Sequence, residues 1–534
     1  MPQAYREQAR MEHPLTWNME SVNMTYVRKD LWDLGDGWND TMLWYAKAVQ
    51  ELQKRPITDN TSWQFLGAIH GFKKDLWISH WQIDEETPLP TQKDQDLFWN
   101  QCQHQSWYFL PWHRGYLLAF ENIVRETIIK LNGPSDWALP YWNYNEIGTR
   151  LHSVTLPHIF YEAKLPDGTD NPLALPKLRF GNTIDGRVVI NPLKINLKSL
   201  DIALFTGGAT GGTPGFGGPE TVFHFDGDVQ GGLENNPHNP VHIAVGGHIN
   251  RPGEKDPFEG LMSDPQMAGL DPVFWLHHAN IDRLWQVWLD RNPAHKNPVD
   301  DPAWAEGPPS GGRPFIMPAP DGSTYTYIVS QMLSLQDLGY TYQDLPAPPQ
   351  ANLATAKVEA TAVADTKVTE LLGANAQPIK LLGSRFESPV RLDKPGIAKV
   401  AQKLAARGLL TAGNAAPLPE ERVYLNVENI RGKLNAVILS LYVNLPDGAS
   451  PEAHPELYAG DIGLFGVRVA SQKDESHAGA GLTAVLDITD IVNRLNVQGD
   501  LNLDHLHISL FASTDLTPAA DISIGRISVY RQGQ

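Results

Sequence analysis

The sequence predicts a mainly α-helical domain at residues 1–345, a linker at residues 346–380, and a C-terminal β-sandwich domain at residues 381–534. Three observations support this division. Apolar residues recur at helical spacing in several N-terminal segments. After Tyr342 the composition changes to a stretch rich in proline, alanine, threonine and valine, which is typical of a linker. From about Glu420 onward, apolar and polar residues alternate with the period of two that is typical of strands.

Four helices joined by long loops are predicted in the N-terminal domain. Their apolar residues follow helical spacing at 43–53, 63–70, 116–131 and 272–290. The last of these helices has a clear start, because Asp271 can cap the first amides and Pro272 suits the first helical position.

The predicted C-terminal strands are short and separated by turn residues. In the first of them, Val423, Leu425 and Val427 point to one face, and the residues between them point to the other. Similar segments follow at 436–443, 464–470, 484–488, 506–511 and 522–529. Short strands in this arrangement predict a β-sandwich.

Composition excludes several classes of partner. The formal net charge of -18 argues against nucleic acid and anionic membranes, since both need a basic face. No apolar run approaches a membrane span, and the first thirty residues show no secretory signal. The single Cys102 excludes intramolecular disulfides and fits a reducing compartment. We therefore expect a cytoplasmic protein, with secretion by another route and homo-oligomerisation left open.

Six histidines fall into two triplets that predict metal binding. In the second triplet, His238 and His242 form an H-x-x-x-H pair, which places both imidazoles on one helix face. A neighbouring helix supplies the third imidazole from His277 or His278, which point about 100° apart. We favour His278, because its i+4 neighbour Asp282 places a carboxylate on the same face.

The first triplet consists of His70, His104 and His113. On one continuous helix His104 and His113 would point to opposite faces, but Pro111 can start a new helix that carries His113 in its first turn. His104 would then lie on a loop or a helix end. Coordination by imidazoles alone suits copper, with zinc or iron as the less favoured metals. Two triplets imply two metal ions, and two coppers imply dioxygen chemistry.

These residues lie in segments that resemble the type-3 copper family of tyrosinases, catechol oxidases and hemocyanins. The matching segments are His70-Gly71, Cys102-Gln103-His104, Pro111-Trp112-His113-Arg114 with Phe120-Glu121, residues 238–242 and residues 271–283. The resemblance spans roughly residues 28–342 and implies a four-helix bundle around two copper ions. It implies that His70, His104 and His113 bind the first copper, and that His238, His242 and His278 bind the second.

Further family features concern chemistry next to the metals. The Cys-x-His spacing of Cys102 and His104 resembles members in which this cysteine forms a thioether bond to the histidine ring; otherwise Cys102 is a small buried apolar residue. The resemblance also implies that Glu234 and Asn239 hold a water that takes the proton from a monophenol. Such a base is needed because a phenol has a pKa near 10. The alternative for Glu234 is a solvated loop carboxylate.

The C-terminal half resembles the covering domain of latent plant and fungal polyphenol oxidases, in which one side chain enters the substrate cavity. Tyr458 and Phe465 are the candidates for this plug. The alternative is a domain that only stabilises the core or mediates oligomerisation.

The resemblance as a whole implies a tyrosinase-like polyphenol oxidase that uses dioxygen and small phenols. Such an enzyme hydroxylates monophenols to o-diphenols and oxidises o-diphenols to o-quinones. The alternatives are a catechol oxidase without monophenolase activity and a hemocyanin-like oxygen carrier. A zinc hydrolase is a more distant alternative, because the H-E-x-x-H pattern is absent from the sequence.

Overall fold

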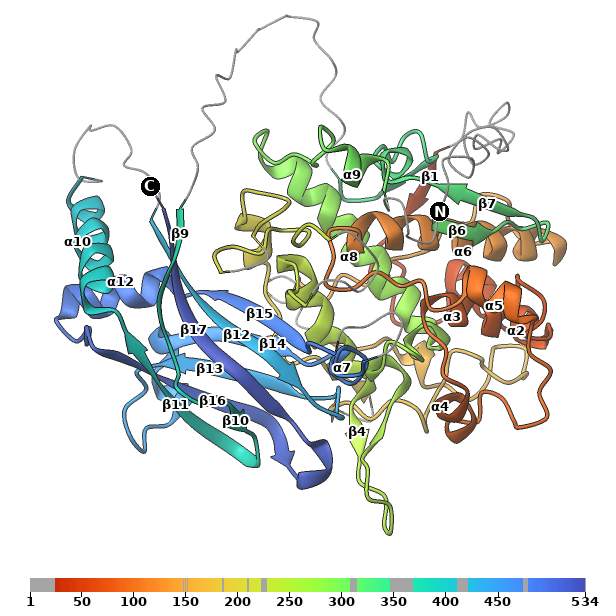
Figure 1. Ribbon diagram of the computed structural model, residues 1–534. Helices are drawn as coiled ribbons and strands as arrows, with labels where there is room; N and C mark the ends of the chain where they lie inside the picture. The colour runs from red at the N-terminus through yellow and green to blue at the C-terminus, as the bar shows by residue number, and fades with distance from the viewer. Residues whose placement is uncertain are drawn as a thin grey trace, which may run out of the picture.

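The computed structural model describes residues 25–146, 148, 150, 152–184, 187–208, 211–221, 228–307, 315–345, 368–410, 421–473 and 479–533. A helical domain and a β domain lie side by side and meet near α7 and β14 (Figure 1). No helix in these ranges combines the length and apolar character required to cross a membrane.

The helical domain is built on five helices, and the four predicted ones are confirmed. The five are α2 (Asp40–Lys54), α3 (Trp63–His70), α6 (Phe109–Lys130), α7 (Asn239–Gly246) and α8 (Pro272–Arg291). Side chains cap three of them: Asn39 accepts from the Met42 amide, Ser62 from the Phe65 amide, and Asp271 from the Val273 amide. The shorter helices are α4 (Lys74–Ser79), α5 (Gln92–Phe98) and α9 (Pro302–Ala305).

Helix α6 begins at Phe109, two residues before the start that Pro111 predicts. Proline is tolerated there because the amides of the first helical turn have no partner within the helix. The helix packs against α2 and α8, and the rings of Phe120 and Trp275 stack at 3.5 Å between α6 and α8. Nine tryptophans are among the largest fully buried side chains, so this residue type mainly fills the core.

Short strand pairs and single helical turns complete the domain. The strands are β1 (Tyr26–Arg28) with β8 (Tyr340–Tyr342), β2 (Thr183–Ile184) with β3 (Arg187–Val188), β4 (His248–Ile249) with β5 (Phe258–Glu259), and β6 (Phe315–Pro318) with β7 (Thr324–Tyr327). The helical turns are η2 (His158–Phe160), η3 (Lys198–Asp201), η4 (Glu234–His238), η5 (Leu261–Ser263), η6 (Ala268–Leu270) and η7 (Val329–Met332). Of these, η4 is a π-helical turn that leads directly into α7.

The predicted C-terminal β domain is confirmed, and its strands join in one curled antiparallel sheet. The strands are β9 (Val368–Ala374), β10 (Ile379–Lys380), β11 (Gly383–Leu392), β12 (Arg422–Arg431), β13 (Ile438–Val443), β14 (Tyr458–Gly463), β15 (Leu482–Asp487), β16 (His505–Leu516) and β17 (Ser523–Gly533). Their order is β14-β13-β16-β11-β9-β17-β12-β15, with β10 paired to β17. Because the end strands β14 and β15 also pack together, the sheet closes around one apolar core. Helices α10 (Lys394–Leu410), α11 (Val467–Ala470) and α12 (Thr489–Gln498) and the turns η8 (Pro451–Ala453), η9 (Pro455–Leu457) and η10 (Pro518–Ala520) complete the domain.

Two sequence predictions about this domain differ from the structure. Strands β9 and β10 lie inside the range 346–380 predicted as a linker, and residues 346–367 of that range lie outside the described residues. The sequence does not predict strand β9, because only Leu372 among its side chains is buried and its apolar and polar residues therefore do not alternate. The segment 464–470, predicted as a strand, contains helix α11, because Gly466 in a left-handed conformation ends the extended backbone.

The two domains are joined by backbone and side-chain contacts. Val229 of the helical domain pairs in parallel with Thr483 of β15, the last strand in the sheet order. At the other end of the sheet, β14 packs against η4 and α7. A Cβ atom at Gly463 would lie 2.9 Å from the Cβ of Asn239, so glycine permits this close approach. The residues that follow β14 are thereby held over the histidine-bearing turn η4 and helix α7.

Candidate metal centre

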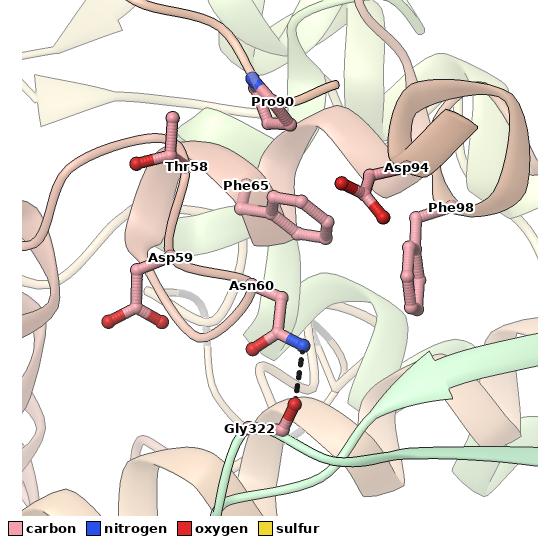
Figure 2. Close-up of a pocket in the computed structure, with 8 residues that line it drawn as sticks. All are labelled: Thr58, Asp59, Asn60, Phe65, Pro90, Asp94, Phe98 and Gly322. Carbon is pink, nitrogen blue, oxygen red and sulfur yellow. Dashed lines mark hydrogen bonds between the residues drawn. The ribbon is translucent and has the colours of Figure 1, made fainter. Parts of the chain in front are cut away.

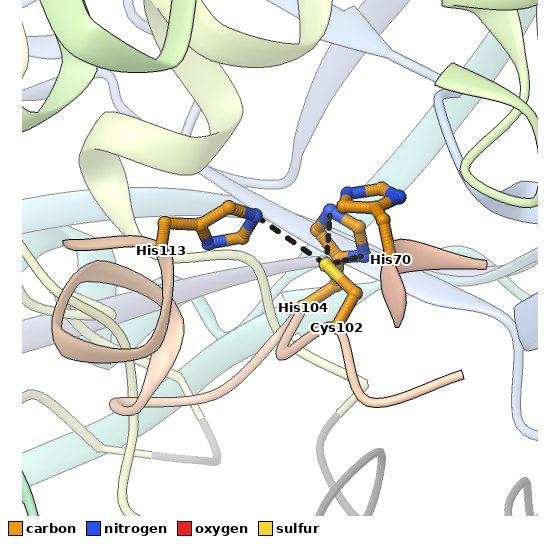
Figure 3. A group of neighbouring side chains, drawn as sticks. All are labelled: His70, Cys102, His104 and His113. Atoms are coloured by element: carbon orange, nitrogen blue, oxygen red, sulfur yellow. Dashed lines mark hydrogen bonds between the residues drawn. The ribbon is translucent and has the colours of Figure 1, made fainter. Parts of the chain in front are cut away.

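The first histidine triplet is assembled from α3, the loop before α6, and α6 itself. His70 is the last residue of α3, His104 lies on the loop after α5, and His113 lies in α6. Their ligand atoms and the Cys102 sulfur all lie within 4.8 Å of one another, and all four side chains are buried (Figure 3). The structure therefore brings together the first predicted triplet.

Hydrogen bonds from the Nδ1 atoms orient two of these rings. His70 Nδ1 donates to the Pro265 carbonyl at 2.7 Å, and His113 Nδ1 donates to the Phe109 carbonyl at 2.7 Å. A ring that donates from Nδ1 presents the lone pair of Nε2, which is the form that binds a metal. Gly71, directly after the end of α3, allows the Pro265 carbonyl to approach, since a Cβ at residue 71 would lie 2.5 Å from the Pro265 oxygen.

The second group contains four histidines, one more than the sequence predicts. His238 ends η4, His242 lies in α7, and His277 and His278 lie in α8. Their ligand atoms also lie within 4.8 Å of one another. His238 Nδ1 donates to the Asn239 side-chain oxygen at 2.8 Å, which again leaves Nε2 free for a metal.

His277 and His278 differ in what their nitrogen atoms contact. His278 Nε2 lies 3.2 Å from His242 Nε2, and His242 Nδ1 donates to the Met262 carbonyl at 2.8 Å. Two nitrogens each about 2.0 Å from one metal lie about 3.3 Å apart, so this pair fits a shared ion. His277 Nδ1 is instead hydrogen-bonded to the Tyr144 hydroxyl at 3.0 Å. Helical spacing alone did not show that both rings lie in the group, because His277 is held there by a residue distant in sequence.

The two groups are adjacent. The rings of His113 and His278 stack at 4.4 Å, and the ring of His104 lies 5.9 Å from that of His238. Four buried ring nitrogens have no hydrogen-bond partner among the described residues: His70 Nε2, His238 Nε2, His277 Nε2 and His278 Nδ1. Unpaired buried nitrogens are costly unless a metal satisfies them, and His70 Nε2 and His238 Nε2 place one such nitrogen in each group, so the residues fit a pair of metal ions.

Burial favours the neutral form of six of these histidines, all except His104. It lowers the pKa of His70 to about 4 and that of His238 to about 3. Burial also lowers the pKa well below its usual value in His113, His242, His277 and His278. Neutral imidazoles bind metals without first releasing a proton.

Glu234 and Asn239 lie beside this centre. The amide of Gln105, directly after His104, donates to both carboxylate oxygens of Glu234 at 3.0 and 2.9 Å. Burial raises the pKa of Glu234 to about 8. The side-chain nitrogen of Asn239 is buried without a hydrogen-bond partner among the described residues. Glu234 is therefore a buried group, and the alternative of a solvated loop carboxylate is wrong.

The prediction that the Asp282 carboxylate supports His278 is also wrong. Asp282 accepts hydrogen bonds from the guanidinium groups of Arg28 and Arg114 and from the hydroxyls of Tyr340 and Tyr342. Arg28 lies in β1, the tyrosines lie in β8, and all of these groups are buried. The i+4 spacing places Asp282 one turn beyond His278, but its charge is paired with the two arginines. It stabilises the fold beneath the metal centre.

Of the two plug candidates, Phe465 contacts the histidine rings and Tyr458 packs within the β domain. Phe465 of the β domain is buried, and its ring stacks on His242 at 4.0 Å and lies 5.5 Å from His104 and 5.7 Å from His238. Tyr458 is half-buried, donates to Asp461, and lies 5.3 Å from Tyr442 within the β domain. Phe465 therefore enters the centre, and Tyr458 does not.

A separate surface hollow of about 290 Å³ carries no comparable group of ligands (Figure 2). It is lined by Thr58, Asp59, Asn60, Phe65, Pro90, Asp94, Phe98 and Gly322. Both carboxylates accept hydrogen bonds in local turns, Asp59 from Thr61 and Asp94 from Thr91. They stabilise the loop and the start of α5.

Seven buried imidazoles around two neighbouring positions, six of them the two predicted triplets, on a helical bundle covered by a β domain, define the class of dinuclear type-3 copper proteins. Residues 60–291 match the family model described as the common central domain of tyrosinase, and residues 368–532 match a domain of unknown function. Tyrosinase HcTyr1 of Hahella sp. (strain CCB-MM4) is 33% identical over 515 residues, which cover 95% of this chain and 99% of that protein. The chain belongs to the tyrosinase family and is a copper-dependent oxidoreductase.

More distant relatives and solved structures agree on the fold. The chloroplastic polyphenol oxidase of Malus domestica is 28% identical over 309 residues, which cover 54% of this chain and 48% of that protein. A latent aurone synthase structure aligns with a TM-score of 0.57 at 19% identity and covers 95% of this chain and 89% of its own. A latent apple tyrosinase structure aligns with a TM-score of 0.53 at 19% identity and covers 96% and 98%. The two-domain architecture is therefore that of latent polyphenol oxidases.

Proposed function

We propose that this chain carries out both reactions of a polyphenol oxidase on small phenols: ortho-hydroxylation of monophenols to o-diphenols, and oxidation of o-diphenols to o-quinones. The proposal rests on the two adjacent groups of imidazoles with inward-facing nitrogens. The first copper would be held by His70, His104 and His113, and the second by His238, His242 and His278. When bound, the copper pair supplies dioxygen binding and electron transfer.

In this proposal Glu234 and Asn239 handle the proton of a monophenol. A phenol has a pKa near 10, so it must lose its proton to bind as phenolate. The Glu234 carboxylate is held in place by the Gln105 amide, and the Asn239 amide has an unpaired nitrogen. Together they would position a water that accepts the proton.

The test is to compare the variant Glu234→Gln with Glu254→Gln, which changes an exposed carboxylate paired with Arg251. We expect Glu234→Gln to lower the rate of monophenol oxidation by about 10²-fold and to lower its ratio to o-diphenol oxidation. Glu254→Gln should leave both rates unchanged. An equal loss of both activities in Glu234→Gln would assign this carboxylate a structural role.

We further propose that the β domain holds the enzyme latent. Phe465 occupies the face of His242 that a phenol would approach, so the domain must move before substrate binds. Limited proteolysis between the domains should therefore raise oxidation of both a monophenol and an o-diphenol. Activity on o-diphenols alone after cleavage would favour the catechol oxidase alternative. If the cleaved protein oxidises neither phenol although it holds its full complement of copper, the oxygen-carrier alternative is favoured.

The thioether between Cys102 and His104 is a proposal supported by the position of the sulfur. Cys102 Sγ lies 3.5 Å from Nδ1 and 3.6 Å from Nε2 of His104, so it is equidistant from the two nitrogens that flank Cε1. Formation of the C–S bond would break the S–H bond of Cys102 and a C–H bond of the His104 ring, and the two protons and two electrons released would reduce dioxygen to hydrogen peroxide, with copper carrying the electrons. The intact mass of copper-loaded protein should be lower than the sequence mass by two hydrogens. A Cys102→Ala variant should show no such difference.

A further inference from the structure

Two buried carboxylates of the helical domain face the β domain. Glu259 ends β5 and Asp264 follows η5, and their side chains are 3% and 0% exposed. Both form ion pairs with Arg468 of α11, whose Nη2 atom lies 3.0 Å from the Glu259 carboxylate and also contacts that of Asp264. Two negative charges in the helical domain therefore share one positive charge from the other domain.

Neighbouring groups of the β domain complete the contact. The Asn435 side-chain nitrogen donates to Glu259 at 3.0 Å and to Asp264 at 3.1 Å. The Ala436 amide donates to the other Glu259 oxygen at 2.8 Å. The Asn435 side-chain oxygen accepts from the Arg468 amide at 3.0 Å, which links the two donors. We call this set of five residues the clamp.

The segment 259–266 that carries the two carboxylates also orients metal ligands. Its Met262 carbonyl accepts from His242 Nδ1, and its Pro265 carbonyl accepts from His70 Nδ1. One short segment is thus held by the β domain through its side chains, and it orients one imidazole of each histidine group through its backbone.

We propose that the clamp makes the β domain a positioning element for both copper sites as well as a cover, an inference that rests on the proposed latency. If Arg468 is lost while the domains stay docked, two buried carboxylates lose their cation, which strongly favours separation of the domains or movement of the segment. Movement of the segment shifts the carbonyls that set the direction of His242 and His70, and separation of the domains leaves that segment without the groups that hold it. Docking and metal retention are therefore coupled through Arg468.

The experiment uses full-length, copper-loaded protein and the variants Arg468→Met, Arg468→Lys and Glu259→Gln. The matched control is Arg385→Met, which removes an exposed arginine of the β domain that is paired with Glu387. A second control, Lys194→Met, breaks the ion pair from Lys194 to Asp461 elsewhere in the domain interface. The readouts are hydrogen–deuterium exchange of segment 259–266, the rate of copper loss to excess EDTA, and the rate of o-diphenol oxidation.

We expect Arg468→Met to speed amide exchange in segment 259–266 and to speed copper loss by about 10-fold or more, since changes to groups that orient metal ligands cost 10–100-fold in affinity. Glu259→Gln should act in the same direction. Arg468→Lys should have a smaller effect because it keeps the cation, and Arg385→Met should have none. Lys194→Met should speed copper loss less than Arg468→Met.

Unchanged exchange and copper loss in both Arg468→Met and Glu259→Gln would overturn the clamp. Equal copper loss in Arg468→Met and Lys194→Met would also overturn it, because any weakening of the interface would then suffice. Failure of the proposed function gives a different result: faster exchange and copper loss in Arg468→Met, with no oxidation of phenols before or after separation of the domains.

Discussion

Replacing Phe465 by alanine should release the enzyme from latency without removing its β domain. The ring is 2% exposed and stacks on His242 at 4.0 Å, close to His104 and His238. In Phe465→Ala, the space that the ring fills beside the second histidine group becomes available to a phenol. The docked state also loses the contacts of a buried aromatic side chain.

The magnitude follows from that burial. Truncation of a buried phenylalanine to alanine costs about 3–5 kcal/mol. The ring packs against the other domain, so we assign the lower end of this range, about 3 kcal/mol, to docking. That loss raises the ratio of separated to docked domains by roughly 10²-fold. The rate of o-diphenol oxidation by uncleaved protein should rise by a similar factor, up to the rate of the cleaved enzyme.

The assay measures o-diphenol oxidation by uncleaved protein at equal copper content before and after limited proteolysis. Tyr458→Phe is the matched control, because it alters the other candidate aromatic residue, whose hydroxyl bonds Asp461 within the β domain. This control should remain latent. If Phe465→Ala keeps the latent rate of the parent protein while cleavage still activates it, Phe465 is not the obstacle to substrate.

Three further predictions concern stability. Asp282→Asn should lower the free energy of unfolding by about 3–5 kcal/mol in urea titrations, because it leaves two buried arginines short of a partner charge; an unchanged midpoint would contradict this. Burial raises the pKa of Glu121 and Asp282, but the neighbouring arginines outweigh burial and hold both pKa values below the usual value. The contribution of these two carboxylates to the free energy of unfolding should therefore be complete above about pH 5 and lost as the pH falls below about 4. Copper removal should lower the melting temperature. Burial lowers the pKa of His70 and His238, so their unfolded forms take up protons first, and the metal-free protein should lose further stability between about pH 6.5 and pH 4. A melting temperature of the metal-free protein that stays flat over that range would exclude this cause.

Much of the fold could be predicted because apolar residues recur at regular spacing within single helices and strands. Helix α8 was predicted to within one residue, since Asp271 and Pro272 form its start and apolar residues follow its inner face. Periodicity does not reveal strand β9, because this strand buries a single side chain, and it predicts a strand in place of α11, because the apolar residues of α11 are few and close together. Periodicity detects an element only when one of its faces is buried over several turns or pleats.

The sequence by itself predicted the two histidine triplets that the structure brings together, because H-x-x-x-H spacing and the position of Pro111 set ring directions within single elements. Only the tertiary structure decided that His277 joins the second group, that Asp282 pairs with Arg28 and Arg114, and that Phe465 enters the centre while Tyr458 does not. It alone brought Arg468 to Glu259 and Asp264. The physical reason is that such contacts join residues far apart in the chain. They depend on how the elements and the two domains pack against each other, which the spacing of residues within one element does not determine.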